Sequence, residues 1–387
     1  MRIGKTKLYA ASVAALTLAA LTTVASPATA EPPPNGTAEV IAFAGSDTTE
    51  DVLDALTTAY RGNTAANPDG DNTVNIPVQA EAGSPAFNVP AQGACTSARN
   101  YVHKLEANQP STYPAPNGST DGKNALQGNA PFPSDNLTTG CIDGGRSSSG
   151  PSRNDPATFE YYAYALDAVS WAHYETSAAP ASLSEAEIQG IYDCTYTNWN
   201  QVGGEDAPIH RYIPQSGSGT RSFFIGTVLA GAEPSTACGP VTEIQEHDGR
   251  AVPTGDRYNA ILPYSVAQWV AQANNVVDDK RGTVVVGHQE NAAGVQNPVS
   301  GPDGNGKYTP DTGIVTEDSE FLGVRYVYNV LDSRIPSYGQ ALRFAGQDGS
   351  GPGYLCDGNS QVTGILTDYG FSPLEPDPIT GEACRLS

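Results

Sequence analysis

The sequence predicts an α/β protein with two lobes, and three observations support that prediction. Apolar segments that fit strands alternate along the chain with amphipathic segments that fit helices, which is typical of a sheet with parallel strands. The chain has 387 residues, more than one hydrophobic core usually holds. Two turns rich in glycine, serine and threonine each stand between an apolar run and a helical pattern.

The first of these turns covers residues 45–49. It follows the apolar run at 40–44 and precedes a helical pattern whose apolar face is formed by Val52, Leu53, Leu56 and Tyr60. A turn of this kind exposes backbone N–H groups at the positive end of a helix, where an oxyanion binds favourably. Taken alone, the turn fits an ordinary helix cap better than an anion site.

The middle of the chain predicts a loop region, a strand and a short helix. Residues 61–139 are rich in asparagine, glycine and proline, so we expect an elaborated loop region there. Residues 161–174 fit a buried strand. Ser184 and Glu187 have the spacing of a capping box, which predicts a helix that ends near Tyr192.

The second turn covers residues 216–221 and leads into a further apolar pattern, formed by Phe223, Phe224, Val228 and Leu229. Two such turns in one chain suggest two half-sites that close on one anion. Beyond it, residues 265–270 fit a helix, and residues 284–286 and 321–330 fit strands.

The N-terminal segment predicts export. Three basic residues lie within residues 1–7, an apolar stretch covers 8–25, and Ala28 and Ala30 fit a small-residue cleavage site, so we expect a signal peptide cut after Ala30. No cysteine lies near this cut, so no lipid anchor is expected, and no later run has the roughly 20 apolar residues that span a membrane. The mature protein is expected to be soluble and secreted or held in the cell envelope.

The net charge of the chain limits the classes of partner that we expect it to bind. Its 20 basic and 42 acidic residues give a formal net charge of −22, which becomes −25 when Arg2, Lys5 and Lys7 leave with the signal peptide. Nucleic acids and anionic membranes bind proteins through lysine and arginine contacts, so neither is an expected partner. The five histidines show no pair at metal-binding spacing, so we expect no metal and no cofactor.

Six cysteines in an exported chain indicate disulfides. No Cys-x-x-Cys motif occurs, which argues against redox catalysis and zinc ribbons. Six cysteines allow 15 pairings. We favour the sequential one, because each disulfide then closes a loop-rich region within one lobe: Cys95 with Cys141, Cys194 with Cys238, and Cys356 with Cys384.

Several segments resemble the phosphate-binding proteins of bacterial ABC importers, which belong to the periplasmic binding protein type II class. The resemblance lies in the turn at 45–49, residues 142–148, Asn198 with Trp199, and residues 218–224, which follow the order of that family. It implies two lobes of mixed sheets flanked by helices, joined by two crossover strands. Residues 31–170 and 264–387 would form the first lobe and residues 171–263 the second.

The resemblance also implies a ligand set in the cleft between the lobes. It would comprise Ser46, Asp47 and Thr48 from the first turn, Ser147 or Ser148 after a strand, and Ser218, Gly219 and Thr220 from the second turn. The implied function is capture of inorganic phosphate or a similar oxyanion by a monomeric protein that is not an enzyme and serves an ABC permease.

Two positions depart from the family. An arginine often stands four residues before the serine of the second turn, but Pro214 stands there in this chain. We therefore expect Arg221, with Arg146 as the second charge, to bind the anion, and we take Arg325 to lie outside the site. An aspartate also follows the strand-end serine in phosphate-binding members, where it accepts the proton of hydrogen phosphate. Here only Asp47 or Asp143 could replace it, which leaves phosphate, sulfate and other oxyanions open.

Two other classes of function remain alternatives. A secreted serine hydrolase or phosphatase would need serine, histidine and aspartate in contact, and neither serine-rich turn has the Gly-x-Ser-x-Gly register. A binding fold adapted as a surface or matrix protein is the second alternative, and the missing lipid anchor favours it slightly.

Overall fold

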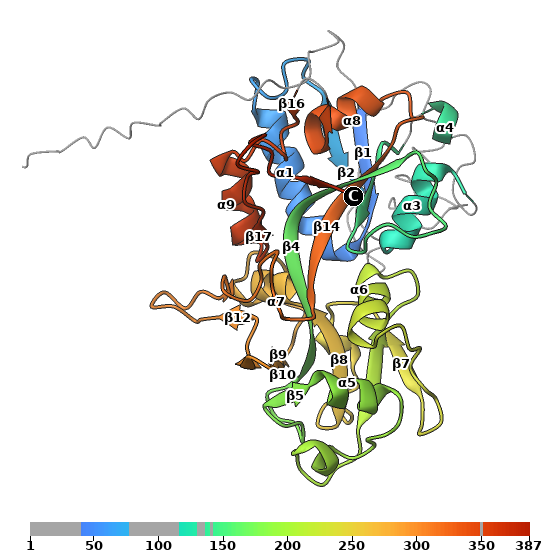
Figure 1. Ribbon diagram of the computed structural model, residues 1–387, viewed down its shortest axis with the longest axis vertical. Coiled ribbons are helices and arrows are strands. Elements are labelled where there is room, and N and C mark those ends of the chain that lie inside the picture. Colours follow the sequence, from blue (N-terminus) through green and yellow to red (C-terminus); the bar gives the residue numbers. More distant parts are fainter. Residues whose placement is uncertain (1–39, 77–115, 130–135, 140–141, 349–350) are drawn as a thin grey trace, which may run out of the picture.

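The computed structural model describes residues 40–76, 116–129, 136–139, 142–348 and 351–387. They form two lobes that lie one above the other in Figure 1, with strands β4 and β14 running through the junction. Helices flank a sheet that has both parallel and antiparallel pairs. The predicted α/β fold with two lobes and two crossover strands is therefore confirmed.

The upper part of the molecule contains the N-terminal elements and the C-terminal ones (Figure 1). They are β1 (Val40–Gly45), η1 (Asp47–Thr49), α1 (Glu50–Gly62), β2 (Asn72–Asn75), α3 (Ser119–Gln127), α4 (Asn136–Thr139), β3 (Gly144–Ser147), α8 (Tyr338–Ala345), β15 (Gln347–Asp348), β16 (Gly351–Pro352), α9 (Ser360–Asp368), β17 (Ser372–Pro373) and β18 (Arg385–Leu386). The long strands β4 (Phe159–Tyr174) and β14 (Val324–Asp332) continue from it toward the lower part.

The lower part contains the central stretch of the chain. Its elements are β5 (Ser182–Ser184), α5 (Glu185–Tyr192), η2 (Trp199–Val202), β6 (His210–Pro214), α6 (Gly219–Phe223), the π-helical turn η3 (Phe224–Val228), β7 (Val241–Ile244), η4 (Gly249–Ala251), β8 (Ala260–Ser265), α7 (Val266–Ala273), β9 (Val284–Val286), β10 (His288–Asn291), β11 (Gly294–Gln296), β12 (Val299–Ser300) and β13 (Thr309–Pro310).

The two lobes share one hydrogen-bonded path of strands, in the order β2-β1-β3-β14-β4-β8-β6-β7. β1 pairs in parallel with β2 and β3, and β6 pairs in parallel with β7 and β8. β14 is antiparallel to both β3 and β4. The ends of β1 and β3 in the upper lobe and of β6 and β7 in the lower lobe therefore bring their following turns to the junction.

β4 is the element that connects the two lobes most directly. It has 16 residues, so it extends about 50 Å at the usual rise of a strand. Its first half pairs with β14, and its second half pairs with β8 and β9. Nearly every side chain of β4 is buried, because the strand lies inside the sheet and is covered on both faces.

Each lobe has an aromatic core of its own. In the upper lobe the rings of Phe43 and Tyr60 pack against Phe344, with centroids 5.3 and 5.0 Å away. In the lower lobe Trp171 and Trp199 are both buried, with centroids 6.5 Å apart. Burying one large aromatic side chain is worth about 1.5–3 kcal/mol, so these rings contribute strongly to each lobe.

Most predicted elements are present. The predicted apolar face of α1 is buried, the capping box of Ser184 and Glu187 starts α5, and α5 ends at Tyr192. The strand predicted at 321–330 lies at Val324–Asp332 instead. The chain turns before it, where the Val324 N–H donates to the Phe321 carbonyl, and Gly323 lies too close to Val169 for any side chain.

The expectation of a loop region at 61–139 is wrong for its described part, which contains β2, α3 and α4. Helix α3 packs on the sheet through Gly122, where a Cβ would collide with the backbone of Ala44 and Gly45. A helix that approaches a strand through glycine needs no broad apolar face. The polar sequence of α3 therefore gave no amphipathic signal.

Two of the three predicted disulfides are present in the structure, Cys194–Cys238 and Cys356–Cys384. Cys95 and Cys141 lie outside the described residues. Each of the two disulfides closes a loop within one part of the molecule, as expected.

The predicted lobe boundaries, with 31–170 and 264–387 in one lobe and 171–263 in the other, remain a prediction. The sheet passes from lobe to lobe without a break, and β4 belongs to both. Within the stretch 264–387, β9 pairs with the end of β4, and β10 pairs with β5 in the lower part of the molecule.

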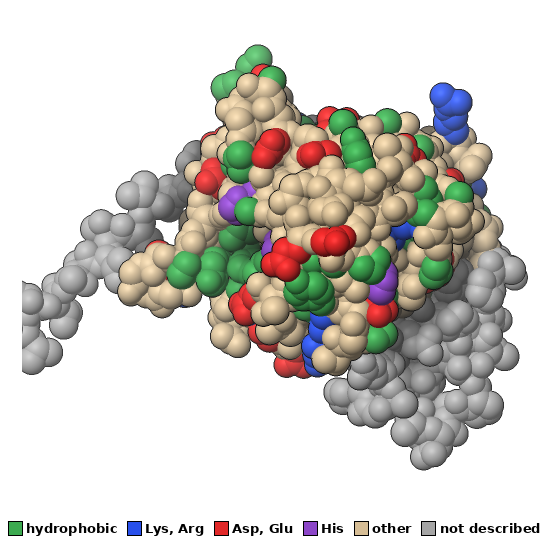
Figure 2. All heavy atoms as spheres, turned by 90° about the horizontal axis from the view of Figure 1, so that it is seen from below, with side chains coloured by type: hydrophobic (Ala, Val, Ile, Leu, Met, Phe, Trp, Pro, Cys, Tyr) green, Lys and Arg blue, Asp and Glu red, His purple; other side chains and the backbone are tan. Residues whose placement is uncertain are grey.

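The surface of the lower lobe reflects the acidic composition. Figure 2 shows this lobe from below, with acidic side chains spread over the face and few basic ones among them. Among the described residues, no helix combines the length and apolar character that crossing a membrane requires.

Candidate functional site

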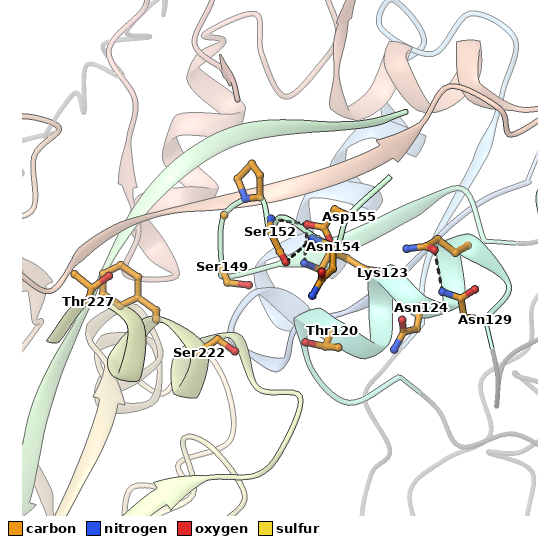
Figure 3. Close-up of a pocket in the computed structure, with 14 residues that line it drawn as sticks. Thr120, Lys123, Asn124, Asn129, Ser149, Ser152, Asn154, Asp155, Ser222 and Thr227 are labelled. Carbon is orange, nitrogen blue, oxygen red and sulfur yellow. Dashed lines mark hydrogen bonds and ion pairs between the residues drawn. The ribbon is translucent and has the colours of Figure 1, made fainter. Parts of the chain in front are cut away.

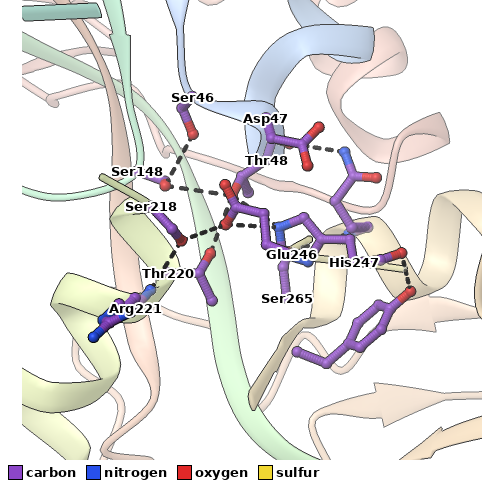
Figure 4. A network of polar contacts seen from close by, with 12 residues as sticks. Ser46, Asp47, Thr48, Ser148, Ser218, Thr220, Arg221, Glu246, His247 and Ser265 are labelled. Carbon is purple, nitrogen blue, oxygen red and sulfur yellow. Dashed lines mark hydrogen bonds and ion pairs between the residues drawn. The ribbon is translucent and has the colours of Figure 1, made fainter. Parts of the chain in front are cut away.

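A cluster of buried hydroxyl groups lies where the two lobes meet (Figure 4). We call it the hydroxyl cluster. The upper lobe contributes four of its members and the lower lobe two. They are Ser46, Thr48, Ser119, Ser148, Ser218 and Thr220, and each is at most 1% exposed.

The first turn enters the cluster because of Gly45. Its φ of 133° is one that residues with a side chain rarely adopt, and a Cβ would collide with the carbonyl oxygen of Arg146. β1 can therefore end beside β3 and direct Ser46 and Thr48 toward the end of β3. Ser46 Oγ donates to Ser148 Oγ at 2.9 Å, and Thr48 Oγ1 donates to it at 3.3 Å.

Ser119 anchors the end of β3 from the first turn of α3. Its Oγ accepts a hydrogen bond of 2.9 Å from the Ser148 N–H and lies 3.4 Å from Ser148 Oγ. Ser119 was not predicted, because it lies in the polar region expected to be loop. The glycine before a serine that opens α3, Gly118, repeats the Gly-Ser pattern of the two recognised turns and could have indicated it.

The lower lobe meets the cluster through the second turn. Thr220 Oγ1 lies 3.2 Å from Thr48 Oγ1, so the two lobes are in direct hydrogen-bond contact. Gly219 faces the upper lobe so closely that a Cβ there would collide with the Oγ atoms of Ser119 and Ser148. Ser218 caps α6 by accepting a hydrogen bond of 3.0 Å from the Arg221 N–H.

Glu246 and His247, on the loop after β7, complete the cluster from the lower lobe. Ser218 Oγ donates to Glu246 Oε2 at 2.7 Å. His247 Nε2 lies 3.3 Å from that oxygen and 3.1 Å from Thr48 Oγ1. Glu246 Oε1 and His247 Nδ1 are buried and have no hydrogen-bond partner among the described residues.

Two carboxyl groups near the cluster have shifted pKa values. The pKa of Glu246 is below its usual value. Burial acts to raise this pKa, but the interaction with His247 and the hydrogen bonds with the hydroxyls of Ser218 and Thr220 lower it by more. Burial and the neighbouring charge of Glu246 raise the pKa of Asp47 to about 6. Asp47 Oδ2 accepts a hydrogen bond of 3.0 Å from Gln245 Nε2, another contact between the lobes.

Arg325 is the arginine that contacts the hydroxyl cluster. It lies in β14, is 4% exposed, and donates from Nη2 to Thr220 Oγ1 at 3.0 Å and to Thr48 Oγ1 at 3.4 Å. The same Nη2 forms an ion pair of 2.7 Å with Asp167 on the facing strand β4. Arg325 lies outside every motif that carries the resemblance, yet its guanidinium contacts the cluster. Arg325 is the only charged residue of the strand predicted at 321–330, and this was the signal that could have found it.

The two arginines favoured by the sequence lie elsewhere. Arg221 projects to the surface, where it pairs with Glu243 and donates to the Pro214 carbonyl at 3.1 Å. Arg146 is fully buried beneath the first turn and donates to five acceptors, four of them backbone carbonyls. Each of its three nitrogens donates to one or more of these acceptors, so the guanidinium of Arg146 supports the turn.

Of the ten predicted ligands, the structure brings six together. Ser46, Thr48, Ser148, Ser218 and Thr220 share the cluster, and Gly219 lies against it. Asp47 is at its edge, joined to Gln245. Ser147 turns away, and its Oγ donates to the Ser149 carbonyl at 2.7 Å. The side chains of Arg146 and Arg221 do not contact the cluster hydroxyls, and Arg221 reaches Ser218 Oγ only through its backbone N–H.

The described residues contain no group of three or more His, Cys, Asp or Glu side chains that could hold a metal ion. The cluster presents hydroxyls, backbone N–H groups, the guanidinium of Arg325, the carboxylate of Glu246 and the imidazole of His247. The hydroxyls, the N–H groups and the guanidinium can donate several hydrogen bonds to one oxyanion.

The comparisons with known proteins agree with this fold. The model of the PBP superfamily domain matches residues 27–345. A putative phosphate ABC transporter substrate-binding protein with bound phosphate from Clostridium perfringens is similar in structure, with a TM-score of 0.51 and 17% identity over 86% of this chain and 98% of that one.

An ABC-type phosphate transport receptor from Vibrio cholerae is similar to the same extent, with a TM-score of 0.50 and 15% identity over 86% of this chain and 99% of that one. At such identities the likeness shows the fold. A search of curated proteins found no match. Because the family model covers most of the residues, from strand β1 to helix α8, the chain belongs to the PBP superfamily.

Proposed function

We propose that this protein is a solute-binding protein that captures phosphate between its two lobes. The observation that carries the proposal is the hydroxyl cluster, in which buried hydroxyls from both lobes converge on the side chain of Arg325. The similar structures are named as an ABC-type phosphate transport receptor from Vibrio cholerae and a putative phosphate ABC transporter substrate-binding protein with bound phosphate from Clostridium perfringens, which supports the same ligand.

The cluster suits an oxyanion better than a neutral solute. Hydroxyls and a guanidinium donate charge-assisted hydrogen bonds to an anion, and each such bond contributes about 1.5–3 kcal/mol. Gly219 has no Cβ to collide with Ser119 and Ser148, so the backbone of the lower lobe can lie directly against the cluster. On binding, the hydroxyls exchange their contacts with one another for contacts with the anion.

Glu246 gives the site a means of choosing phosphate over sulfate. The family's usual aspartate is absent after the strand-end serine, and Glu246 is the buried carboxylate beside Ser218 and Thr220. Its Oε1 is free to accept the proton of hydrogen phosphate. Sulfate has no proton at neutral pH and would place an unpaired negative charge beside this carboxylate.

The hydrolase alternative receives no support from the geometry. In a catalytic triad, a carboxylate orients the far nitrogen of the histidine whose near nitrogen accepts the nucleophile's proton. Here Glu246 and Thr48 both contact Nε2 of His247, and Nδ1 has no partner among the described residues. His247 is therefore not arranged as a general base.

The remaining parts of the proposal concern the setting of the protein. We propose that it is exported with cleavage after Ala30, acts as a monomer and serves an ABC permease. A periplasmic or secreted location agrees with the two disulfides, since disulfides persist in oxidising compartments.

Titration calorimetry with phosphate and sulfate tests the function. Phosphate is expected to bind and sulfate to bind far more weakly. Thr220→Val keeps the shape of the side chain but removes its hydroxyl, so phosphate affinity should fall about tenfold or more. Thr242→Val on the exposed face of β7 is the matched control and should bind as the native protein does.

An unaltered affinity in Thr220→Val would place the anion elsewhere. A protein that binds neither anion would favour the surface or matrix role over solute capture.

A further inference from the structure

Three amide side chains join the two lobes beside the hydroxyl cluster. Asn117 precedes α3 in the upper lobe, whereas Gln215 follows β6 and Gln245 follows β7 in the lower lobe. Asn117 Nδ2 donates to Gln245 Oε1 at 3.1 Å, and Asn117 Oδ1 accepts from Gln245 Nε2 at 3.4 Å and from Gln215 Nε2 at 3.3 Å. We call these three side chains the amide ring.

The ring closes on the backbone of Glu246. Gln215 Oε1 accepts a hydrogen bond of 2.8 Å from the Glu246 N–H, and Gln245 is the residue directly before Glu246 in the chain. An upper-lobe side chain, Asn117, is therefore bonded to both residues that hold the start of the loop with Glu246 and His247. Because the Glu246 N–H and the Gln245 side chain are both held, the direction in which the Glu246 side chain leaves the backbone is held as well.

The upper lobe fixes the position of Asn117. The Asn117 N–H donates to Asp121 Oδ2 at 3.3 Å in the first turn of α3, and the backbone of Asn117 pairs with that of Gly45. The next residue, Gly118, has a φ of 133°, and a Cβ there would collide with the Gly217 carbonyl of the lower lobe. The amide of Asn117 therefore meets the lower lobe from a fixed position.

The lower lobe holds the other side of the same loop. The His247 carbonyl accepts hydrogen bonds from the Tyr264 hydroxyl at 2.5 Å and from Gln272 Nε2 at 3.0 Å. His247 has a φ of 61°, which residues with a side chain rarely adopt, so the surrounding bonds maintain this conformation. Glu246 thus lies between an anchor in the lower lobe and the amide ring, which reaches the upper lobe.

The amide ring is distinct from the groups that would donate to the anion. Among the described residues, none of its hydrogen bonds goes to a hydroxyl of the cluster. Its three side chains are half-buried, and amides add no net charge beside the site. Removing one amide therefore leaves the cluster hydroxyls and Arg325 with their own contacts.

We propose that Asn117, together with Gln215 and Gln245, is a positioning residue for phosphate recognition. The amide ring holds Glu246 in the direction from which its carboxylate accepts the proton of hydrogen phosphate. This inference rests on the proposed function, because it takes Glu246 as that acceptor. It adds that the preference for a protonated oxyanion is completed across the lobe boundary, by an upper-lobe residue that acts through Glu246.

A double-mutant cycle on phosphate affinity, measured by titration calorimetry, tests the inference. Asn117→Ala removes the three hydrogen bonds of the Asn117 amide and should weaken phosphate binding about tenfold. Glu246→Gln keeps the shape of the side chain but removes the carboxylate. In that background Asn117→Ala should change phosphate affinity less than twofold, because the group that it positions is absent.

Sulfate gives a second comparison, since it has no proton for Glu246 to accept. Asn117→Ala should change sulfate affinity less than twofold, so the ratio of phosphate to sulfate affinity should fall about tenfold. A general loosening of the contact between the lobes would weaken both anions by the same factor and would leave that ratio unchanged.

Asn124→Ala is the matched control. Asn124 is another half-buried asparagine of the upper lobe, and Figure 3 shows it on α3 at a cavity of about 600 Å³ that residues outside the amide ring line. Its substitution should leave phosphate affinity within twofold of the native value. Gln215→Ala breaks the ring from the lower lobe and should repeat the result of Asn117→Ala, so a folding defect in one variant does not decide the test.

Two results would show that the inference is wrong while phosphate capture stands. One is an equal loss of phosphate affinity on Asn117→Ala with and without the Glu246 carboxylate, and the other is no loss in either background. If the native protein binds no phosphate, the proposed function itself fails.

Discussion

Two buried arginines on neighbouring strands of the same sheet have opposite environments. Arg146, beneath the first turn, donates to four backbone carbonyls and to the side chain of Asn75. Arg325, at the floor of the cleft, donates mainly to side chains: the Asp167 carboxylate and the hydroxyls of Thr48 and Thr220.

The difference shows that burial alone does not identify a binding arginine. Backbone carbonyls cannot leave without unfolding the turn, so the partners of Arg146 are fixed and its role is structural. Hydroxyls rotate, so Thr48 and Thr220 can turn toward a ligand while Arg325 keeps its bond to Asp167. A buried arginine that contacts movable side chains is the better candidate for binding.

The largest expected effect comes from removing the fixed arginine. Arg146→Met would remove one donor from each of four buried carbonyls, of which those of Phe43 and Gly45 also accept from a backbone N–H, and would remove the donor to Asn75 Oδ1. Each buried group left unsatisfied costs about 1–3 kcal/mol. We expect the free energy of unfolding to fall by more than about 3 kcal/mol, as measured by urea denaturation.

The control for this loss is Arg334→Met, whose side chain is 41% exposed and pairs only locally with Asp332. A loss in Arg146→Met no larger than in this control would contradict a structural role for Arg146.

The second effect concerns the arginine at the cleft. Arg325→Lys retains the charge but loses the planar guanidinium, whose Nη2 reaches both threonines. Phosphate affinity should fall about tenfold to a hundredfold, which is about 1.4–2.8 kcal/mol. Stability should change less than in Arg146→Met, because Asp167 keeps its bonds with Ser265 Oγ and the Ala267 N–H.

Calorimetry and urea denaturation of the same Arg325→Lys sample separate the two losses. A phosphate affinity within twofold of the native value would show that Arg325 does not bind the ligand, and the contrast drawn with Arg146 would be wrong.

A smaller effect follows from the acid that lies between the lobes. Asp47 has a pKa of about 6 in the folded protein, raised from 3.8, so the folded state binds more protons than the unfolded state between about pH 4 and 6. The ligand-free protein should therefore become more stable as the pH falls from 7 to 5, by about 1–2 kcal/mol from this half-buried group.

Asp47→Asn should remove that gain, and Asp368→Asn on the exposed side of α9 should keep it. Thermal melts at pH 7 and pH 5 give the comparison. The opposite shift of Glu246 acts at lower pH, since a carboxyl with a lowered pKa loses its stabilising effect only as the pH falls below its ordinary value. An Asp47→Asn variant with the native pH dependence would disprove the assignment.

The smallest effect is expected at Arg221, the arginine that the sequence favoured. Its ion pair with Glu243 is partly exposed, and exposed pairs contribute about 0–1 kcal/mol. Arg221→Ala should leave phosphate affinity within twofold of the native value. A loss of phosphate affinity as large as that of Arg325→Lys would show that Arg221 contributes to phosphate binding. The assignment of Arg325 as the binding arginine would then be wrong.

The turns at 45–49 and 216–221 could be predicted because each is a local pattern of a strand, small residues and a helix. Choosing among neighbours within them needed the backbone geometry. Thr220 and Arg221 are consecutive in a helix and therefore point about 100° apart, so only one of them can face the cluster. Ser147 and Ser148 similarly point away from each other at the end of a strand.

The rest of the site could not be predicted because its contacts are remote in sequence. Arg325 lies 277 positions after Thr48, and no local pattern connects them. Glu246 and His247 lie on a loop whose position depends on how β7 pairs with β6. Ser119 was hidden because α3 packs through glycine and lacks the apolar stripe that marks most helices.

Gly219 has no side chain, and this matters for the design of a fluorescent phosphate sensor from this protein. The backbone of the lower lobe packs on the serines of the upper lobe at this point, so residue 219 is one of the positions that limit how closely the two lobes approach. A pair of fluorescent dyes, one on each lobe, would report that spacing. Alanine at this position would act as a spacer one atom thick, and a dye-labelled Gly219→Ala protein would serve as the calibration standard for lobes held apart.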